Sequence, residues 1–375
     1  MVYVDDISGA GNKNTIENIG RNLRQMEETK KFTFNLDKSK YLVINTGTGK
    51  EEVPEIELLK GKMEKGKEYE FLGNYIDEKG TVERQLDEVE RKMHGMVKGI
   101  KQIGAEDKLG KLSTEARILM YEKTAIPSMT YNLECWSNLR QRDWDHLERI
   151  QAAAIKSILH LPQSTPYWGI LMETAIWPMK QRVEYQKMML YHQLMHSDDK
   201  RVAKQVVQDQ KLRQQEKCWY DDVRQIAERL QMNVQEVMMR KKSEWKNMTK
   251  TRLQKEIEEI LYQKRQGMTK LRHLKGKYER QEYIKQVGIM EASEFIRVRL
   301  EMKDIGKNQG QGRTCAGCKR ENESTEHIMK CQETSDMIGI KGDIMWINGK
   351  VDELRKITNF LNKYIEKRTK KSSNV

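Results

Sequence analysis

The sequence has little proline, an odd number of cysteines and no long apolar run. Its 375 residues include only 5 prolines, fewer than the many turns of an all-β protein would need. Five cysteines cannot all pair, and three of them fall in one short segment, which excludes a disulfide framework and favours a reducing compartment. No run of about 18 apolar residues is present, and the N-terminus lacks a signal-peptide pattern. We therefore expect an intracellular protein with no membrane partner.

The sequence also lacks a Gly-rich phosphate loop and a recognisable Ser-His-Asp set, and its 7 histidines are scattered. The sequence is instead rich in charged residues, with an excess of basic ones. The net charge is +13, and the segment Lys200–Lys303 alone holds 26 basic and 15 acidic residues, a surplus of 11. Such a surplus favours a polyanionic partner, although lysine-rich solvated helices give the same composition. Four aromatic residues of this region either stack on bases or, more commonly, fill the core: Trp219, Trp245, Tyr262 and Tyr278.

Residue periodicity divides the chain near residue 81. Before it, we expect two strand arms around an acidic turn at 1–7 and a helix over 12–31 capped by Asn14 or Thr15. Alternating apolar residues predict strands at 32–36, 41–44 and 69–76. After residue 81, apolar residues recur at helical spacing. Helices are expected from Val82 to Ile100, over 113–125 and 144–161, each of the last two stopped by a proline, and over 179–195. The fold class is therefore α+β, dominated by helices after residue 81.

A second local pattern lies near the C-terminus. Cys315, Cys318, His327 and Cys331 have the spacing C-x2-C-x8-H-x3-C, with a short helix expected over 324–330. Three thiolates and one imidazole form the closed tetrahedral set that structural zinc prefers. The alternative is that these are free buried cysteines beside a surface histidine. We expect one structural Zn²⁺ here.

Two adjacent aspartates stand at the start of the chain, in Tyr3-Val4-Asp5-Asp6. Paired carboxylates at the tip of an apolar strand suit divalent ions that neutralise the attacking and leaving oxygens of phosphoryl transfer. Magnesium favours such carboxylates together with phosphate oxygens. An ordinary acidic turn is the simpler interpretation of the doublet alone.

The doublet and several segments after it together favour a metal site over an ordinary turn, because they resemble the motifs of one enzyme family in the same order. Tyr3–Asp6 resembles the Tyr-x-Asp-Asp motif of reverse transcriptases, Asn35–Lys40 resembles their next palm motif, and Phe71-Leu72-Gly73 resembles their primer grip. The thumb segment of the non-LTR retrotransposon enzymes is similar to Ile126-Pro127, Tyr131, Glu134-Cys135-Trp136 and the continuation over 159–166. Ile296–Arg299 followed by the cysteine pattern resembles their C-terminal knuckle. The sequence thus resembles the C-terminal part of a LINE or jockey-like reverse transcriptase.

This resemblance implies an organisation and a set of roles. Residues 1–81 would be the end of the palm, 82–200 a helical thumb, 201–305 a basic connector, 313–333 the zinc knuckle, and 334–375 a C-terminal helix and basic tail. Asp5 would bind Mg²⁺ with Asp6 beside it, and Lys38 would meet the phosphates of the incoming nucleotide. The residues implied to contact substrate are Tyr3, Phe71, Leu72 and Gly73.

The same family implies RNA and DNA as partners, in the nucleus and cytoplasm. Its first metal-binding aspartate and its fingers precede the Tyr-x-Asp-Asp motif, and this sequence starts at that motif. We therefore expect the chain alone to be inactive as an RNA-directed DNA polymerase, with Mg²⁺ bound only in a completed site. Two alternatives stay open: a non-catalytic nucleic-acid-binding protein that uses the thumb and knuckle, and a relic without function.

Overall fold

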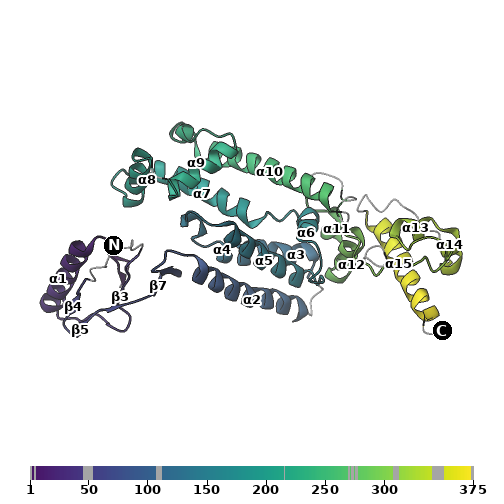
Figure 1. The fold of residues 1–375 in the computed structure, drawn as a ribbon, viewed down its shortest axis with the longest axis horizontal. Helices are drawn as coiled ribbons and strands as arrows, with labels where there is room; N and C mark the ends of the chain where they lie inside the picture. Colours follow the sequence, from purple (N-terminus) through teal and green to yellow (C-terminus); the bar gives the residue numbers. More distant parts are fainter. Residues whose placement is uncertain are drawn as a thin grey trace. The chain divides into compact units, whose positions relative to one another are not determined.

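The computed structural model describes residues 2–3, 6–44, 54–106, 112–214, 216–268, 271, 274, 278–306, 312–339 and 350–372. The chain forms two compact units, Met1–Glu88 and Val89–Val375, and their boundary falls inside helix α2 (Glu83–Glu106) (Figure 1). No helix among these residues is both long and apolar enough to cross a membrane.

The first unit contains short strands in pairs. Its described part has four two-stranded sheets. Antiparallel pairs are β1 (Val2–Tyr3) with β2 (Asp6–Ile7), β4 (Glu57–Leu58) with β5 (Gly61–Lys62), and β7 (Glu68–Phe71) with β8 (Asn74–Asp77). The remaining pair, β3 (Lys40–Tyr41) with β6 (Glu64–Lys65), is parallel. The strand arms expected at the N-terminus are thus present as β1 and β2.

Helix α1 (Lys13–Lys30) lies against β4. Its N-cap is Asn12, whose side chain accepts a hydrogen bond from the Thr15 amide at 3.0 Å. The expectation of a cap at Asn14 or Thr15 was therefore wrong by a few residues, because both lie inside the first turn. Near the other end of α1, the buried carboxylate of Glu27 accepts the backbone amides of Phe34 and Leu59, each at 2.7 Å.

Those hydrogen bonds explain why the strand expected at 32–36 is absent. The Phe34 amide bonds to a side chain instead of a neighbouring strand, and Phe32 packs edge-on against Phe34. The strand expected at 41–44 is also shorter than predicted, since β3 covers only Lys40–Tyr41. The alternating apolar residues at 32–36 therefore belong to a loop in which Phe32 and Phe34 pack on each other.

The strand expected over 69–76 is a hairpin. Leu72 and Gly73 form its two-residue turn with φ of 49° and 77°, between the paired residues Phe71 and Asn74. A two-residue hairpin turn whose twist matches the right-handed twist of the flanking strands requires positive φ at both central residues. Gly73 meets it without cost, whereas a leucine in this region is uncommon.

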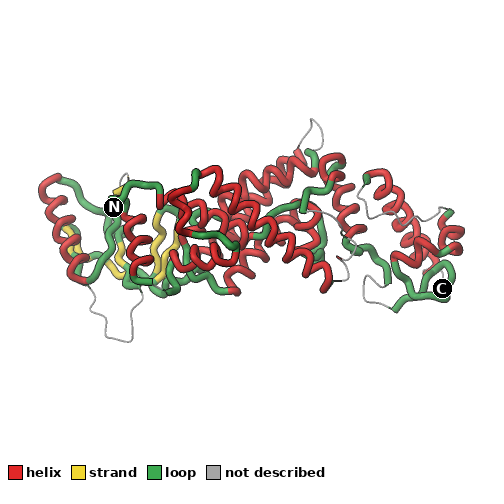
Figure 2. Tube along the Cα trace, turned by 90° about the horizontal axis from the view of Figure 1, so that it is seen from above, coloured by secondary structure: helices red, strands yellow, loops and turns green. Residues whose placement is uncertain are grey.

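The second unit is helical in its described residues (Figure 2). Its α-helices after α2 are α3 (Thr114–Met120), α4 (Ile126–Met129), α5 (Gln141–Ile158), α6 (Tyr167–Thr174), α7 (Met179–Met195), α8 (Val202–Leu212), α9 (Trp219–Arg229), α10 (Lys242–Gly267), α11 (Glu282–Gln286), α12 (Ile289–Arg299), α13 (Thr325–Lys330), α14 (Gln332–Ile338) and α15 (Val351–Ser372). A π-helix, η1 (Tyr121–Ala125), and two 3₁₀ turns, η2 (Leu133–Cys135) and η3 (Val234–Met239), complete it. The mainly helical architecture expected after residue 81 is confirmed.

Pro127 does not end its helix as expected. The chain passes from α3 through η1 into α4, so that Pro127 occupies the first turn of α4. A proline inside a regular helix clashes with the carbonyl four residues earlier and lacks an amide proton. The wider π turn shifts the pairing, with the Ile126 amide bonding to the Tyr121 carbonyl. The helix therefore continues to Met129.

Helix α7 forms the centre of the second unit, with α5 and α10 both packed against it (Figure 1). One apolar cluster joins α7, α9 and α10 and includes Tyr191, Val223, Trp245 and Leu253, all nearly inaccessible to solvent. A buried pair ties α6 to α12, since Arg299 Nε donates to Glu173 Oε1 at 2.8 Å and Tyr283 also donates to this carboxylate. The helices around α7 are thus fixed by both apolar and polar contacts.

Candidate metal centre

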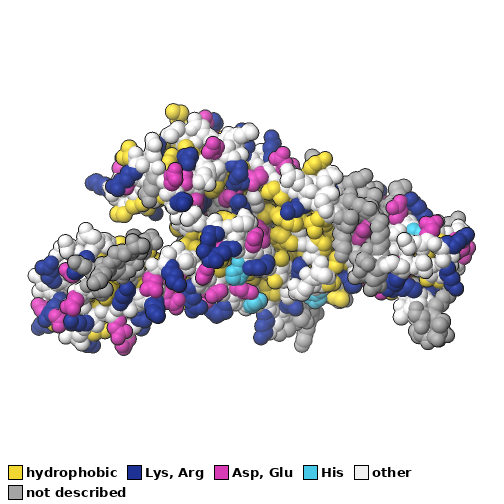
Figure 3. Space-filling view, viewed as in Figure 1, with side chains coloured by type: hydrophobic (Ala, Val, Ile, Leu, Met, Phe, Trp, Pro, Cys, Tyr) yellow, Lys and Arg dark blue, Asp and Glu magenta, His cyan; other side chains and the backbone are white. Residues whose placement is uncertain are grey.

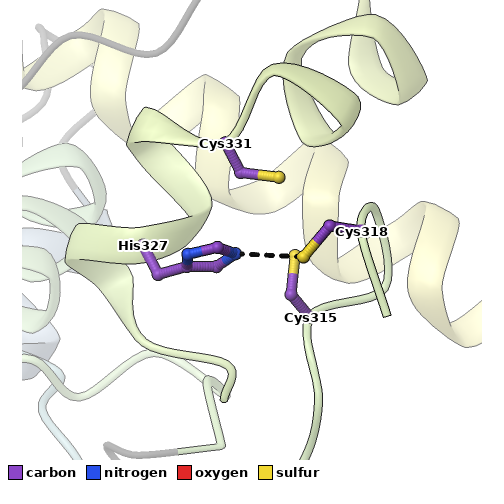
Figure 4. Close-up of side chains that lie close together, drawn as sticks. All are labelled: Cys315, Cys318, His327 and Cys331. Carbon is purple, nitrogen blue, oxygen red and sulfur yellow. Dashed lines mark hydrogen bonds between the residues drawn. The ribbon is translucent and has the colours of Figure 1, made fainter. Parts of the chain in front are cut away.

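The four residues with metal-ligand spacing come together in space (Figure 4). One ligand atom from each of Cys315, Cys318, His327 and Cys331 lies within 4.8 Å of all the others. The Cys318 sulfur is 3.4 Å from His327 Nε2. A tetrahedral zinc ion, with bonds of about 2.3 Å to sulfur and about 2.0 Å to nitrogen, would hold such atoms about 3.5–3.8 Å apart. The donor set therefore fits zinc after a contraction of about 1 Å.

Local structure around the site explains the positions of the ligands. Cys315 and Cys318 flank a turn in which the Lys319 amide bonds to the Cys315 carbonyl at 2.8 Å. His327 lies in α13, and Cys331 follows as the residue between α13 and α14. The expected short helix is therefore present: it carries His327, and Cys331 directly follows its last residue.

Gly317 lies where the ligand loop contacts α14. A Cβ at this position would lie 2.7 Å from the backbone nitrogen of Thr334 and 2.9 Å from its Cα. Its φ is not in the left-handed region. The glycine is thus needed because the ligand loop packs directly on the backbone of α14.

Further polar groups orient the ligands. Glu321 Oε2 is 2.9 Å from His327 Nδ1, which leaves Nε2 directed toward the cysteines. A carboxylate on the second ring nitrogen fixes the tautomer and raises the basicity of a metal-binding imidazole. Cys315 contacts Thr334 Oγ1 at 3.2 Å. Neither partner was singled out from the sequence, because a glutamate or threonine near the ligands carries no distinctive spacing.

The electrostatics favour a thiolate at one ligand. Hydrogen bonds from the backbone amides of Arg320 and Glu321, with a further one from His327, lower the pKa of Cys318 to about 6. Burial raises the pKa of Cys331. The pKa of His327 is raised: burial opposes this, but hydrogen bonds to Cys318 and Cys315 outweigh it. The site thus supplies one readily formed thiolate at Cys318, and a metal ion that binds there would displace the proton that burial favours on Cys331.

The ligand segment shares one core with the last helix of the chain. Ala316 donates its amide to the Tyr364 hydroxyl at 3.0 Å. The apolar cluster here contains Cys315, Ile328 and Met329 from the ligand segment and Ile357, Phe360, Leu361 and Tyr364 from α15. We call residues 312–339 with α15 the zinc module. The expected knuckle, 313–333, therefore packs against the described residues that follow it, 334–339 and α15.

The basic residues around the ligands are mostly occupied. Arg313 pairs with Asp304 at 2.5 Å and with the fully buried Glu323, Arg320 pairs with Glu333, and Lys330 pairs with Glu326 at 2.9 Å. Arg368 of α15 also contacts Glu323. These pairs neutralise charge that nucleic-acid phosphates would otherwise meet, so the arrangement favours a stabilising role for the zinc module.

The residues of the polymerase resemblance are spread over the first unit. Asp5 lies outside the described residues, while Tyr3 and Asp6 face each other as a backbone pair of β1 and β2. Lys38 is exposed in a turn closed by its own amide bonding to the Asn35 carbonyl at 3.2 Å. Leu72 is 37% exposed at the tip of the β7–β8 hairpin. Within the described residues, no metal-binding group assembles around any of these positions.

Three of the four aromatic candidates for base stacking belong to the core. Trp245 and Tyr278 are buried and donate to the carbonyls of Met188 and Ile176. Trp219 is partly buried and donates to the Glu134 carbonyl at 2.7 Å. Only Tyr262 of the four is exposed, at 54%, with Arg265 over its ring. The prediction that these aromatic residues fill the core is thus confirmed for Trp219, Trp245 and Tyr278.

Comparison with known proteins gives no relative for this chain: no family model matches it, and no curated protein or solved structure is significantly similar.

Proposed function

We propose that this chain is a nucleic-acid-binding part of a non-LTR retrotransposon reverse transcriptase. The helical second unit would bind RNA and DNA, and Zn²⁺ would stabilise the zinc module. The ordered polymerase-like segments of the sequence support the family, and the four assembled ligands support a structural metal, because a Cys3His set leaves no open coordination position. The alternative is a non-catalytic binding protein built from the same helices and module.

One surface feature carries the binding proposal. Lys242, Lys246 and Lys250 are exposed at every fourth residue of α10. Four residues advance a helix by about 6 Å, so the three ammonium groups follow one another along a line. Like charges at this spacing destabilise a helix unless an anion neutralises them. Among the described residues, none of the three has a carboxylate within ion-pair distance.

Figure 3 shows basic and acidic side chains interspersed over one face of the molecule. Other exposed lysines of the described residues, such as Lys241 and Lys255, also have no carboxylate within ion-pair distance, so the three lysines of α10, which we call the lysine stripe, stand out by their regular spacing along one helix. Still others have carboxylates nearby, such as Lys285 with Glu282 and Lys370 with Glu366. Three unpaired lysines on a rigid helix are suited to the phosphates of one strand.

Binding of labelled RNA, single-stranded DNA and an RNA–DNA hybrid tests the proposal across a range of salt concentrations. Each phosphate contact contributes about 0.7–0.9 to the slope of log affinity against log salt. Replacing the three stripe lysines by alanine should reduce that slope by about 2–3. A matched variant with the paired lysines Lys285, Lys330 and Lys370 replaced should keep it. Equal slopes for the two variants would refute the stripe.

A primer-extension assay with Mg²⁺ distinguishes a chain that only binds nucleic acid from one that also synthesises DNA. We expect binding without extension by this chain alone. Extension that Asp5→Ala abolishes would show a complete catalytic site and overturn the expectation of inactivity. Absence of any salt-dependent binding would remove both the family proposal and the binding alternative.

A further inference from the structure

A cavity of about 480 Å³ lies between α2 and α5, and all the residues that line it belong to the second unit. Its floor is apolar: Met93 and Val97 of α2 and Ile150 and Ala154 of α5 line it, and each is at most 7% exposed. Polar side chains from the same two helices line the rest of the cavity. The helix pair therefore holds polar groups around an open space above a packed core.

Three of these polar side chains are metal ligands by type: Glu90 and His94 of α2 and His146 of α5. Glu90 Oε2 lies 3.1 Å from His146 Nε2. A tetrahedral zinc ion, with bonds of about 2.0–2.2 Å to oxygen and nitrogen, holds two such ligands about 3.3–3.5 Å apart. The contact between the two helices thus already has nearly the separation of two ligands of one ion.

His94 stands one helical turn after Glu90, so both side chains project from the same face of α2. It is exposed, and within the described residues no hydrogen bond or ion pair holds its ring. In that part of the chain, the zinc module supplies the one set of ligand atoms that already lie within 4.8 Å of one another. His94 must therefore turn toward the cavity to complete a second set, and it breaks no such contact when it does.

The three side chains are open to solvent, so an ion can reach them. The side chain of His146 is 27% exposed and that of Glu90 is 44% exposed. Figure 3 shows histidine side chains gathered on the surface over α2 and α5. An exposed pair of this kind contributes little to stability, so an ion can replace the direct contact at small cost.

We propose that Glu90, His94 and His146 bind a divalent transition-metal ion such as Zn²⁺. Imidazole nitrogens suit such ions, and two histidines with one glutamate hold zinc in sites that keep one coordination position open. Arg149 and Ser157 line the same cavity and supply donors for a water or an anion at that position. The site differs in this from the closed Cys3His set of the zinc module, and it does not rest on the proposed function.

Titration of the full chain with Zn²⁺ against a chromogenic chelator tests the site. We expect two ions per chain, the second bound more weakly because it has three protein ligands and no thiolate. Loss of an outer-shell partner costs about 10–100-fold in metal affinity, so His94→Ala and His146→Ala should each weaken the second ion at least that much. His160→Ala, at an exposed histidine just after α5 and outside the cavity lining, should keep both ions.

Two further measurements locate the second ion. Cys331→Ser should lose the ion of the zinc module and keep the other. Zn²⁺ beyond one equivalent should protect His94 and His146 from diethyl pyrocarbonate, mapped by mass spectrometry, and leave His160 reactive. A single ion per wild-type chain, or a second ion held equally by His94→Ala and His160→Ala, would overturn the site. Because these assays contain no nucleic acid, that result would leave the proposed function standing.

Discussion

Removal of zinc should unfold the zinc module and leave the other helices intact. The helices at stake are α13, α14 and α15, with 6, 7 and 22 residues. They are joined to the ligands through Phe360, Leu361 and Tyr364, each at most 1% exposed. Burying three such side chains stabilises by about 4–9 kcal/mol in total. A structural zinc ion contributes about 10–16 kcal/mol, so the metal stabilises the module more than these apolar contacts do.

Hydrogen exchange followed by mass spectrometry measures this directly. After chelation, amides of α13–α15 should lose protection, while α7, α9 and α10 keep theirs because their core is separate. Cys331→Ser should reproduce the effect and reduce bound zinc to well below one ion per chain. Cys135→Ser, at an exposed cysteine outside the site, should change neither quantity. Full protection of α15 in protein shown to be metal-free would mean that the module folds without zinc.

Three further substitutions test individual contacts. Arg299→Met should lower the free energy of unfolding in urea by about 3–5 kcal/mol because it leaves the buried Glu173 carboxylate uncompensated; an unchanged midpoint would contradict the role of this pair. Glu321→Gln should weaken zinc affinity about 10–100-fold, measured by competition with a chromogenic chelator, because it removes the carboxylate on His327 Nδ1; Glu326→Gln serves as the control. Gly317→Ala should destabilise the zinc module by about 1–3 kcal/mol, since its Cβ would collide with the backbone of α14, and a wild-type melting curve would argue against that close approach.

The helices of the second unit were largely predictable, because apolar residues recur at helical spacing within each helix. The expected helix over 179–195 matches α7 at both ends, and the long stripe from Val82 to Ile100 lies in α2 except for Val82, which directly precedes it. The metal ligands were predictable for the same reason, since all four lie within 17 residues and their spacing is the signal. Local sequence thus suffices where the interacting groups are neighbours along the chain.

Features set by distant residues were not predictable. The Glu27 carboxylate takes the amide of Phe34 and thereby removes an expected strand. Leu72 adopts a left-handed conformation that its residue type disfavours, so residue types alone predict continuous strand across the β7–β8 turn. The pairing of Arg313 with Asp304 and Glu323, and the lack of any pair at Arg117, depend on which carboxylates the fold brings near. Spacing along the sequence carries no information about such contacts.

Photocrosslinking of an RNA–DNA hybrid to the zinc-loaded chain, mapped by mass spectrometry, would locate the bound nucleic acid. We expect crosslinks on the exposed face of α10 around Lys242–Lys250, with few on the zinc module, whose basic residues are largely paired. Crosslinks confined to the zinc module, or none at any salt concentration, would contradict the proposal that the helical second unit binds nucleic acid.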